Sequence, residues 1–375
     1  MTPGFPRADN SLVARWWWTV DRWTLAAILM LIGIGAMMTM AATPPVAEKL
    51  GLDPFHFVRR QMSLLPIAVG IMLATSLLDL QGVRRLAAAV LLVSVALLAA
   101  TFMVGAEIKG ARRWINLPGF SLQPSEFVKP SFAVICAWLF ALQRRQDGTP
   151  GDLIALAVYA LVLCLLLLQP DIGMAIGVSA CWCSQYFVAG LRLRWMFGLL
   201  GAGVGALALA YSVFPHVESR INRFLDPQSG DTYQVTRSLE AFTNGGLAGR
   251  GPGEGTVKTH LPDAHSDFVF AVAGEEFGLI ACLIIVLLFG FVVVRGFARL
   301  LGETSLFALL ATAGLLVQFG LQALINMGST LHILPTKGMT LPFISYGGSS
   351  LLALSLGMGF VLALTRKRYG AADGG

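Results

Sequence analysis

Long runs of apolar residues, separated by short polar segments, repeat along almost the whole chain. A helix needs about 20 apolar residues to cross the hydrocarbon core of a bilayer, and most of these runs have about that length. The pattern therefore predicts an all-α polytopic membrane protein of about ten transmembrane helices, folded as a single membrane domain over residues 1–375. The expected spans are residues 24–42, 62–80, 86–104, 127–142, 153–168, 174–190, 196–214, 268–294, 306–326 and 343–364.

The composition excludes an ordinary soluble protein. Hydrophobic residues make up 56% of the chain and charged residues only 13%, with a mean hydropathy of +0.71. A soluble domain carries roughly 25% charged residues, so this chain has too few of them to cover an aqueous surface. The five cysteines all fall in apolar runs, where we expect small buried hydrophobic residues rather than disulfides or metal ligands. No nucleic-acid partner is expected.

The distribution of charge predicts which side of the membrane each segment faces. With the N-terminus inside, the inner segments hold 14 Lys and Arg residues, against 8 in the short outer segments. Lys and Arg are enriched in short cytoplasmic loops. We therefore expect a cytoplasmic N-terminal segment 1–23, a cytoplasmic tail 365–375, and one long extracytoplasmic loop 215–266 between the seventh and eighth helices.

That long loop is rich in Gly, Pro, Asn and Asp. Loops of this length are usually functional or disordered, and its aromatic and apolar positions indicate a partly helical segment lying on the surface. The glycine run 249–255 could be mistaken for a phosphate-binding loop. No strand precedes it and no Gly-Lys-Ser/Thr follows, so a flexible hinge is expected there.

The outer segments carry more cations than short external loops usually do. Each cation alone is typical of an anchor to lipid headgroups, but several near one leaflet favour a site for an anion such as a pyrophosphate. These cations are Arg59, Arg60, Lys109, Arg112, Arg113, Lys129 and Lys337.

Two charged residues stand near the start of the fourth span. Glu126 and Lys129 are three residues apart, on one face of the predicted helix. They form either a local ion pair that neutralises itself or a cation held in register for a substrate phosphate. An ionisable residue within a span costs roughly 2.5–3.5 kcal/mol on insertion scales, which makes it a candidate functional residue.

Three further polar clusters lie on the same predicted side. In Gln169–Gly173 an aspartate either caps the sixth helix or lines a bend within the membrane. The stretch Leu261–Phe270 brings several acids to the start of the eighth span, where apolar surroundings can raise a carboxylate pKa and so favour a general base. The segment 334–350 adds Lys337 and a glycine pair that allows close approach of the backbone.

At these clusters the chain resembles the SEDS family (shape, elongation, division and sporulation) of peptidoglycan glycosyltransferases. The resemblance covers nearly the whole chain, through the helix count, the long outer loop and the order of the motifs. The segments Gly251–Lys258, Thr232–Leu239 and Leu334–Gly338 are similar to the cell-division branch more than to the elongation branch. Ser266 stands where the family usually has a threonine, and Arg113 matches the family's arginine.

The resemblance implies an enzyme that polymerises lipid II into glycan strands for septal cell-wall synthesis. The transfer would invert the anomeric carbon and release undecaprenyl pyrophosphate, with Asp267 as general base. Positive charge placed where an anion develops would stabilise the leaving group. The residues expected to bind substrate are Arg113, Glu126, Lys129, Lys337, His265 and Ser345, with Glu126 orienting Lys129. A divalent metal, Mg or Mn, is left open as a cofactor, with no ligands assigned.

The same resemblance implies a place and partners for the protein. We expect it in the bacterial cytoplasmic membrane at the division septum, with its active site on the extracytoplasmic side. Lipid II, surrounding membrane lipids, a class B penicillin-binding protein that crosslinks the new glycan, and other division proteins are the expected partners.

Two other functions fit many-helix topology. A lipid II flippase would also place charged residues within spans and use a broken hairpin such as the one near Gln169. Its key charges should lie near the bilayer midplane, whereas these cluster at one face. A non-catalytic scaffold of the division complex would tolerate loss of Asp267.

Overall fold

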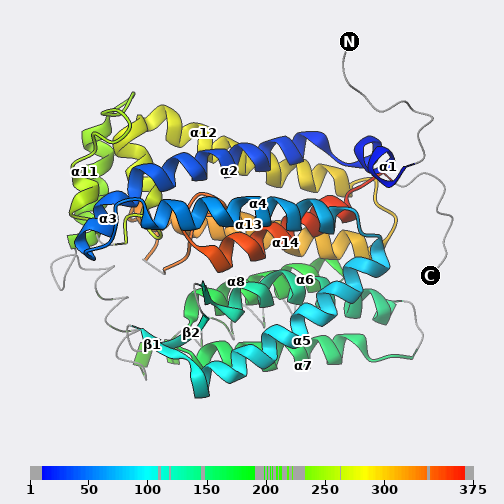
Figure 1. Ribbon diagram of the computed structural model, residues 1–375. Coiled ribbons are helices and arrows are strands. Elements are labelled where there is room, and N and C mark those ends of the chain that lie inside the picture. Colours follow the sequence, from blue (N-terminus) through cyan, green and yellow to red (C-terminus); the bar gives the residue numbers. More distant parts are fainter. Residues whose placement is uncertain are drawn as a thin grey trace, which may run out of the picture.

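The computed structural model describes residues 11–108, 111–117, 120–144, 148–190, 233–261, 263–335 and 338–367, with a few single positions between 198 and 222. Within these residues, seven helices are long and apolar enough to cross a membrane, and two shorter apolar helices accompany them. They lie side by side as one elongated bundle (Figure 1). The chain is therefore an integral membrane protein with an all-α core.

Nine of the ten expected spans coincide with apolar helices in the described part of the chain. The remaining one, 196–214, falls largely outside the described residues. The helices are α2 (Arg22–Ala42), α4 (His56–Ser76), α5 (Leu80–Val104), α6 (Pro124–Arg144), α7 (Gly151–Leu168), α8 (Ile172–Val188), α12 (Val269–Leu300), α13 (Leu306–Thr330) and α14 (Gly348–Leu364).

Three helix starts differ by five or six residues from the sequence-based expectation, and one of them is that of α5, which begins at Leu80 rather than near residue 86. α4 begins at His56 rather than near residue 62, because Arg59 and Arg60 interrupt the apolar run without interrupting the helix. Long cationic side chains can reach water from the end of a span. α14 begins at Gly348 rather than at 343, since Phe343 adopts a left-handed φ of 64° that a continuing α-helix does not allow.

The most deeply buried spans are α6 and α13, which form the centre of the bundle. In α6, 83% of the most apolar window is buried inside the protein, and in α13 the share is 67%. By contrast, α12 exposes large apolar side chains along one face, as expected for a helix in contact with lipid. These side chains include Leu279, Ile280, Leu283, Ile284 and Leu287.

One end of the bundle, named the loop end here, carries short elements between the spans. Three antiparallel strands in the order β1 (Ala106–Ile108), β2 (Ala111–Leu117) and β3 (Phe120–Leu122) connect α5 to α6. Helices α3 (Pro44–Lys49) and α11 (Tyr233–Gly245) also lie there, with the 3-10 turn η1 (Val257–Thr259) (Figure 1). α11 confirms the expected surface helix, whereas the strands were not anticipated.

The opposite end, named the terminal end, carries the amphipathic helix α1 (Leu12–Thr19) and the end of α14 (Figure 1). The backbone N–H of Lys367 donates to the carbonyl of Thr19 at 3.1 Å, which ties the two ends of the described chain together. Asp21, buried at the start of α2, accepts from Arg295 at 2.7 and 2.9 Å and from Arg299 at 3.2 Å. These bonds join the start of α2 to the end of α12.

A break in α12 shapes the loop end. Gly278 has φ 76° and ψ −176°, so the helical hydrogen bonds are interrupted there. The freed N–H of Leu279 donates to the carbonyl of Gly246 at 3.0 Å, and the carbonyl of Glu275 accepts from the N–H of Arg250 at 3.0 Å. The end of α11 and the glycine-rich segment thus replace the lost bonds, as backbone at membrane depth requires.

Candidate active site

A cavity of about 890 Å³ opens between the spans at the loop end. It is lined by side chains from the strands, from the first turns of α6 and from the segments that precede α12 and α14. Its charged and polar lining residues include Arg60, Arg113, Gln123, Glu126, Lys129, Asp171, Gln234, Asp263, His265, Asp267, Gln322, Thr340 and Ser350. A space of this size accepts a large polar ligand.

The cation of α6 is buried and held by two oxygen atoms. Lys129 Nζ lies 2.8 Å from Glu126 Oε2 and donates at 2.8 Å to Gln322 Oε1. Both charged side chains are less than a tenth exposed. An ammonium group has three donors, so one donor of Lys129 remains beyond these two partners. Lys129 therefore forms the ion pair that the sequence predicts and also lines the cavity.

The acid expected to act as base lies in a tight turn just before α12. Asp267 lines the cavity, and its Oδ2 is 3.5 Å from the position that a Cβ on Gly338 would occupy. Asn326 Nδ2 donates to the backbone carbonyl of Asp267 at 2.9 Å and to that of Met339 at 2.7 Å. The turn is thereby bound to α13 and to the segment that precedes α14.

Ser345 lies behind this turn rather than in the cavity. It is 5% exposed, its hydroxyl donates to the carbonyl of Ser266, and it accepts from the N–H of Leu341 at 2.8 Å. Both of its hydrogen bonds are made within the protein, and they support the turn that carries Asp267. A role of Ser345 in substrate binding stays a prediction from the sequence.

Arg113, on β2, is largely committed to the turn between α7 and α8. Its Nε donates to the carbonyl of Gln169 at 3.1 Å, and a terminal nitrogen donates to that of Pro170 at 2.6 Å. The other terminal nitrogen is 3.6 Å from Asp171 Oδ2. Burial raises the pKa of the Asp171 carboxyl, and the charge of Arg113 acts against that rise. The expected bend at this segment thus holds an arginine at the cavity wall.

His265 belongs to an aromatic group at the rim of the same cavity. Its ring stacks on Phe57 at 5.8 Å between centroids and lies 5.5 Å from the ring of Tyr346. Burial raises the pKa of the Tyr346 hydroxyl, and Arg60 beside it acts in the opposite direction. Arg60 itself lines the cavity, so it adds a cation to those of α6 and β2.

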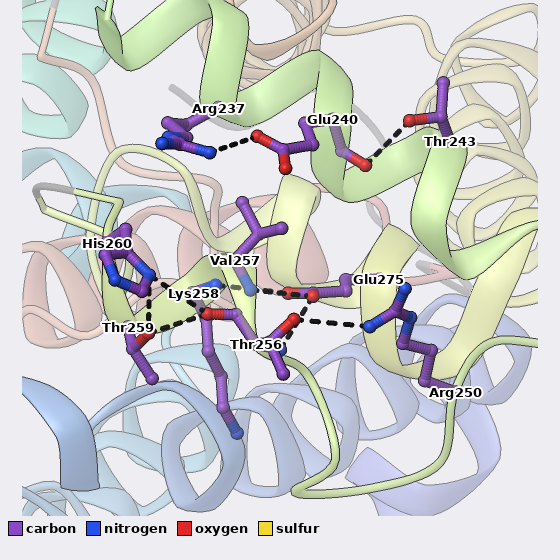
Figure 2. Close-up of polar contacts among 10 residues, drawn as sticks. All are labelled: Arg237, Glu240, Thr243, Arg250, Thr256, Val257, Lys258, Thr259, His260 and Glu275. Carbon is purple, nitrogen blue, oxygen red and sulfur yellow. Dashed lines mark hydrogen bonds and ion pairs between the residues drawn. The ribbon is translucent and has the colours of Figure 1, made fainter.

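Two buried acids within α12, Glu275 and Glu276, are not among the residues that line the cavity. Glu275 accepts hydrogen bonds from the backbone N–H groups of Thr256 and Val257, both at 2.8 Å, and of Lys258 at 3.1 Å (Figure 2). Glu276 accepts from Lys258 Nζ. Glu276 also accepts from the backbone N–H of Gly253 at 3.0 Å, so α12 binds the glycine run 249–255, which differs from the flexible hinge expected there.

The structure thus brings five of the expected residues to one cavity: Arg113, Glu126, Lys129, His265 and Asp267. Lys337 lies outside the described residues. Sequence reasoning missed Gln322 and Asn326 as parts of the site. Their signal is present, since two amides four residues apart in an apolar run fall on one helix face.

The described residues bring together no group of three or more His, Cys, Asp or Glu side chains that could hold a metal ion. We therefore assign no metal ligands.

Comparison with known proteins places this arrangement in a family. The family model of cell cycle proteins FtsW, RodA and SpoVE matches residues 22–370. The chain is 44% identical over 371 residues to the probable peptidoglycan glycosyltransferase FtsW of Caulobacter vibrioides (strain NA1000 / CB15N), covering 99% of this chain and 95% of that protein. It is 35% identical over 377 residues to the protein of the same name from Tolumonas auensis, covering 95% and 97%.

Solved structures give the same result. A chain from a peptidoglycan synthase complex, described as showing structural coordination of polymerization and crosslinking, matches with a TM-score of 0.75 and 28% identity, covering 92% of this chain and 97% of that one. The rod shape determining protein RodA of Thermus thermophilus matches with a TM-score of 0.69 and 28% identity, covering 93% and 97%. The chain therefore belongs to the FtsW, RodA and SpoVE family of cell cycle proteins.

Proposed function

We propose that the chain is a peptidoglycan glycosyltransferase that polymerises lipid II into glycan strands at the division septum. The name shared by its FtsW relatives supports the enzyme class. The observation that carries the site is the cavity that joins an acid, Asp267, to the buried cation Lys129. Glycosyl transfer from a lipid pyrophosphate needs both a proton acceptor and a stabiliser of the leaving anion.

In the proposed reaction, the 4-hydroxyl of one lipid-linked disaccharide attacks the anomeric carbon of the growing chain. A carbon–oxygen bond forms to the acceptor while the bond to the pyrophosphate oxygen breaks, which inverts the carbon. The Asp267 carboxylate takes the hydroxyl proton. Asn326 and Ser345 bind the backbone of its turn, so the segment that carries the carboxylate is held in place before substrate binds.

The leaving pyrophosphate takes up negative charge as this bond breaks. Lys129 lines the cavity and retains one donor for it, while Glu126 and Gln322 fix the ammonium group. Arg113 supplies positive charge nearby, although two of its five donors are occupied by backbone carbonyls. Arg60 is a further cation for the same anion, and Lys337 stays a prediction from the sequence.

We further propose that the loop end faces the extracytoplasmic side and that a class B penicillin-binding protein binds there. The charge bias supports this orientation, with Arg295 and Arg299 near the opposite end of α12. A solved relative described as part of a peptidoglycan synthase complex supports a partner that crosslinks the product.

The test is polymerisation of lipid II by the purified protein with its cognate transpeptidase. The wild-type protein should make strands longer than a dimer, and Asp267→Ala should reduce their formation by about a hundredfold or more, since general bases contribute about 10²–10⁴-fold. Lys129→Ala should weaken lipid II binding or turnover. Glu254→Gln, which changes an exposed acid of the same loop, is the matched control and should polymerise normally.

Equal polymer from folded Asp267→Ala would remove Asp267 as the base. Unchanged kinetics in Lys129→Ala would remove that residue from the anion site. Transport of lipid II across vesicles without polymer would favour the flippase instead.

A further inference from the structure

Three amide side chains form a row along α13. Gln318, Gln322 and Asn326 follow one another at intervals of four residues, so they lie on one face of the helix. Each donates its NH₂ group to a backbone carbonyl of another segment. Placing such polar groups in an apolar span is costly unless each bond is made, so the row is a feature that needs an explanation.

The first two amides act on the cation of α6. Gln318 Nε2 donates to the carbonyl of Lys129 at 3.1 Å, and Gln322 Oε1 accepts from Lys129 Nζ at 2.8 Å. Gln322 also donates through Nε2 to the Thr340 carbonyl at 2.9 Å. The backbone and the side chain of Lys129 are therefore both bound to α13.

The third amide acts on the acid. Asn326 is 1% exposed and bridges the carbonyls of Asp267 and Met339. A Cβ placed on Gly338, next to Met339, would lie 3.5 Å from Oδ2 of Asp267, so this segment runs beside the carboxylate. One amide therefore sets the position of the Asp267 backbone and of the segment beside its carboxylate.

We propose that this row, named the amide row, is a positioning device that fixes the distance between the leaving-group cation and the general base. This inference rests on the proposed function. Lys129 lies on α6 and Asp267 lies before α12, and α13 supplies a common support for both through Gln322 and Asn326. The three are positioning residues.

Gln322 and Asn326 should affect different kinetic constants. Gln322 holds the Lys129 ammonium, which contacts the pyrophosphate in the bound substrate as well as in the leaving group, so its loss should raise KM and also lower kcat to a smaller extent. Asn326 holds the base, which acts only when the hydroxyl attacks, so its loss should lower kcat. A shift of about 1 Å in a reacting group can cost about a hundredfold in rate.

The experiment compares Asn326→Leu and Gln322→Met in the full-length protein with its transpeptidase partner and lipid II. Asn326→Leu should lower kcat by about 10–100-fold with KM within about twofold of wild type. Gln322→Met should raise KM by about tenfold with a smaller change in kcat, since a hydrogen bond to a charged group is stronger than one between neutral groups.

Gln185→Met is the matched control. Gln185 is also a buried amide, and its Nε2 donates to the carbonyls of Ala133 on α6 and Leu310 on α13 at 2.7 and 3.0 Å. It joins the same two helices without lining the cavity. A variant that merely loosened the bundle should therefore resemble Gln185→Met in its kinetics and melting temperature.

Hydrogen exchange gives a readout that does not depend on activity. Asn326→Leu should speed amide exchange in residues 263–268 and 338–340 by about tenfold or more, and Gln185→Met should not. Equal kcat values and equal exchange rates in Asn326→Leu and Gln185→Met would show that the amide row does not position the general base. If the wild-type protein made no polymer while the exchange result held, the proposed function would fail and the support of the turn by α13 would stand.

Discussion

At the scale of single residues, the charged groups of the chain show how one side chain can serve two purposes. Lys129 forms the ion pair with Glu126 that its spacing predicts, and it also lines the cavity. These were alternative interpretations of the sequence, yet an ammonium group has enough donors for both. A buried cation that is only partly satisfied by the protein is suited to a ligand anion, because the cost of its burial is already met in the folded state.

Asp21 provides a prediction about pH. Burial tends to raise the pKa of its carboxyl, but hydrogen bonds from Arg295, Arg299 and Thr24 outweigh it and lower the pKa from 3.8 to about 2. A depressed folded-state pKa stabilises the protein above pH 3.8, and this stabilisation is lost as the pH falls toward 2. The contribution is roughly 2 kcal/mol, at about 1.4 kcal/mol for each pKa unit.

Asp21→Asn should therefore lower the unfolding temperature at pH 6 and lose much of the acid dependence between pH 4 and pH 2. Thermal unfolding in detergent, followed through tryptophan fluorescence, measures both. Other acids titrate equally in the two proteins, so their difference isolates Asp21. Parallel pH curves for wild type and variant would show that the cluster with Arg295 and Arg299 contributes nothing.

At the scale of elements, the break in α12 supplies the hydrogen-bonding groups that bind the end of α11 and the glycine-rich segment at the loop end. The sequence shows only a glycine within a long apolar run. In the folded protein, a Cβ on Gly278 would lie 2.4 Å from the nitrogen of Gly249 and 2.5 Å from the oxygen of Leu247. Neither atom can give way easily, because both belong to backbone that replaces the helical bonds of α12.

Gly278→Ala should destabilise the protein by about 2 kcal/mol or more, since it combines a left-handed φ with a backbone clash. Gly290→Ala, on the same helix with no atom within 4 Å of the new Cβ, is the control. It should be neutral or slightly stabilising because alanine has the higher helix propensity. Equal melting temperatures for the two variants would contradict the importance of the kink.

At the scale of the whole molecule, the sequence predicts the spans well and the contacts between them poorly. Lipid requires long apolar helices, so hydropathy reveals them directly. The strands β1 and β3 have three residues each, too few for a periodic signal. The bond from Lys129 to Gln322 joins residues 193 positions apart, and only the packing of α6 against α13 creates it. The charged residues that line the cavity could therefore be predicted from the sequence, whereas the hydrogen bonds that hold them in place could not.

The orientation of the molecule is a prediction for which the chain offers two matched positions. Glu254 is exposed in the glycine-rich segment at the loop end, and Gly302 is exposed just beyond α12 at the terminal end. Cysteines introduced at these two positions should differ in whether a membrane-impermeant maleimide labels them in intact cells. Glu254→Cys should be labelled in intact cells, and Gly302→Cys only after the cells are opened, because Arg295 and Arg299 mark the cytoplasmic end of α12.

The native cysteines set the background, since all five lie in apolar helices and should react slowly in both situations. Labelling of Gly302→Cys in intact cells, with Glu254→Cys unlabelled, would show that the protein has the reverse orientation in the membrane. The cavity would then open to the cytoplasm, and the cations at the terminal end would face the extracytoplasmic side, against the charge bias. In that case the proposed polymerisation on the outer side would fail even with the geometry of Asp267 and Lys129 intact, because the cavity would open on the opposite side of the membrane.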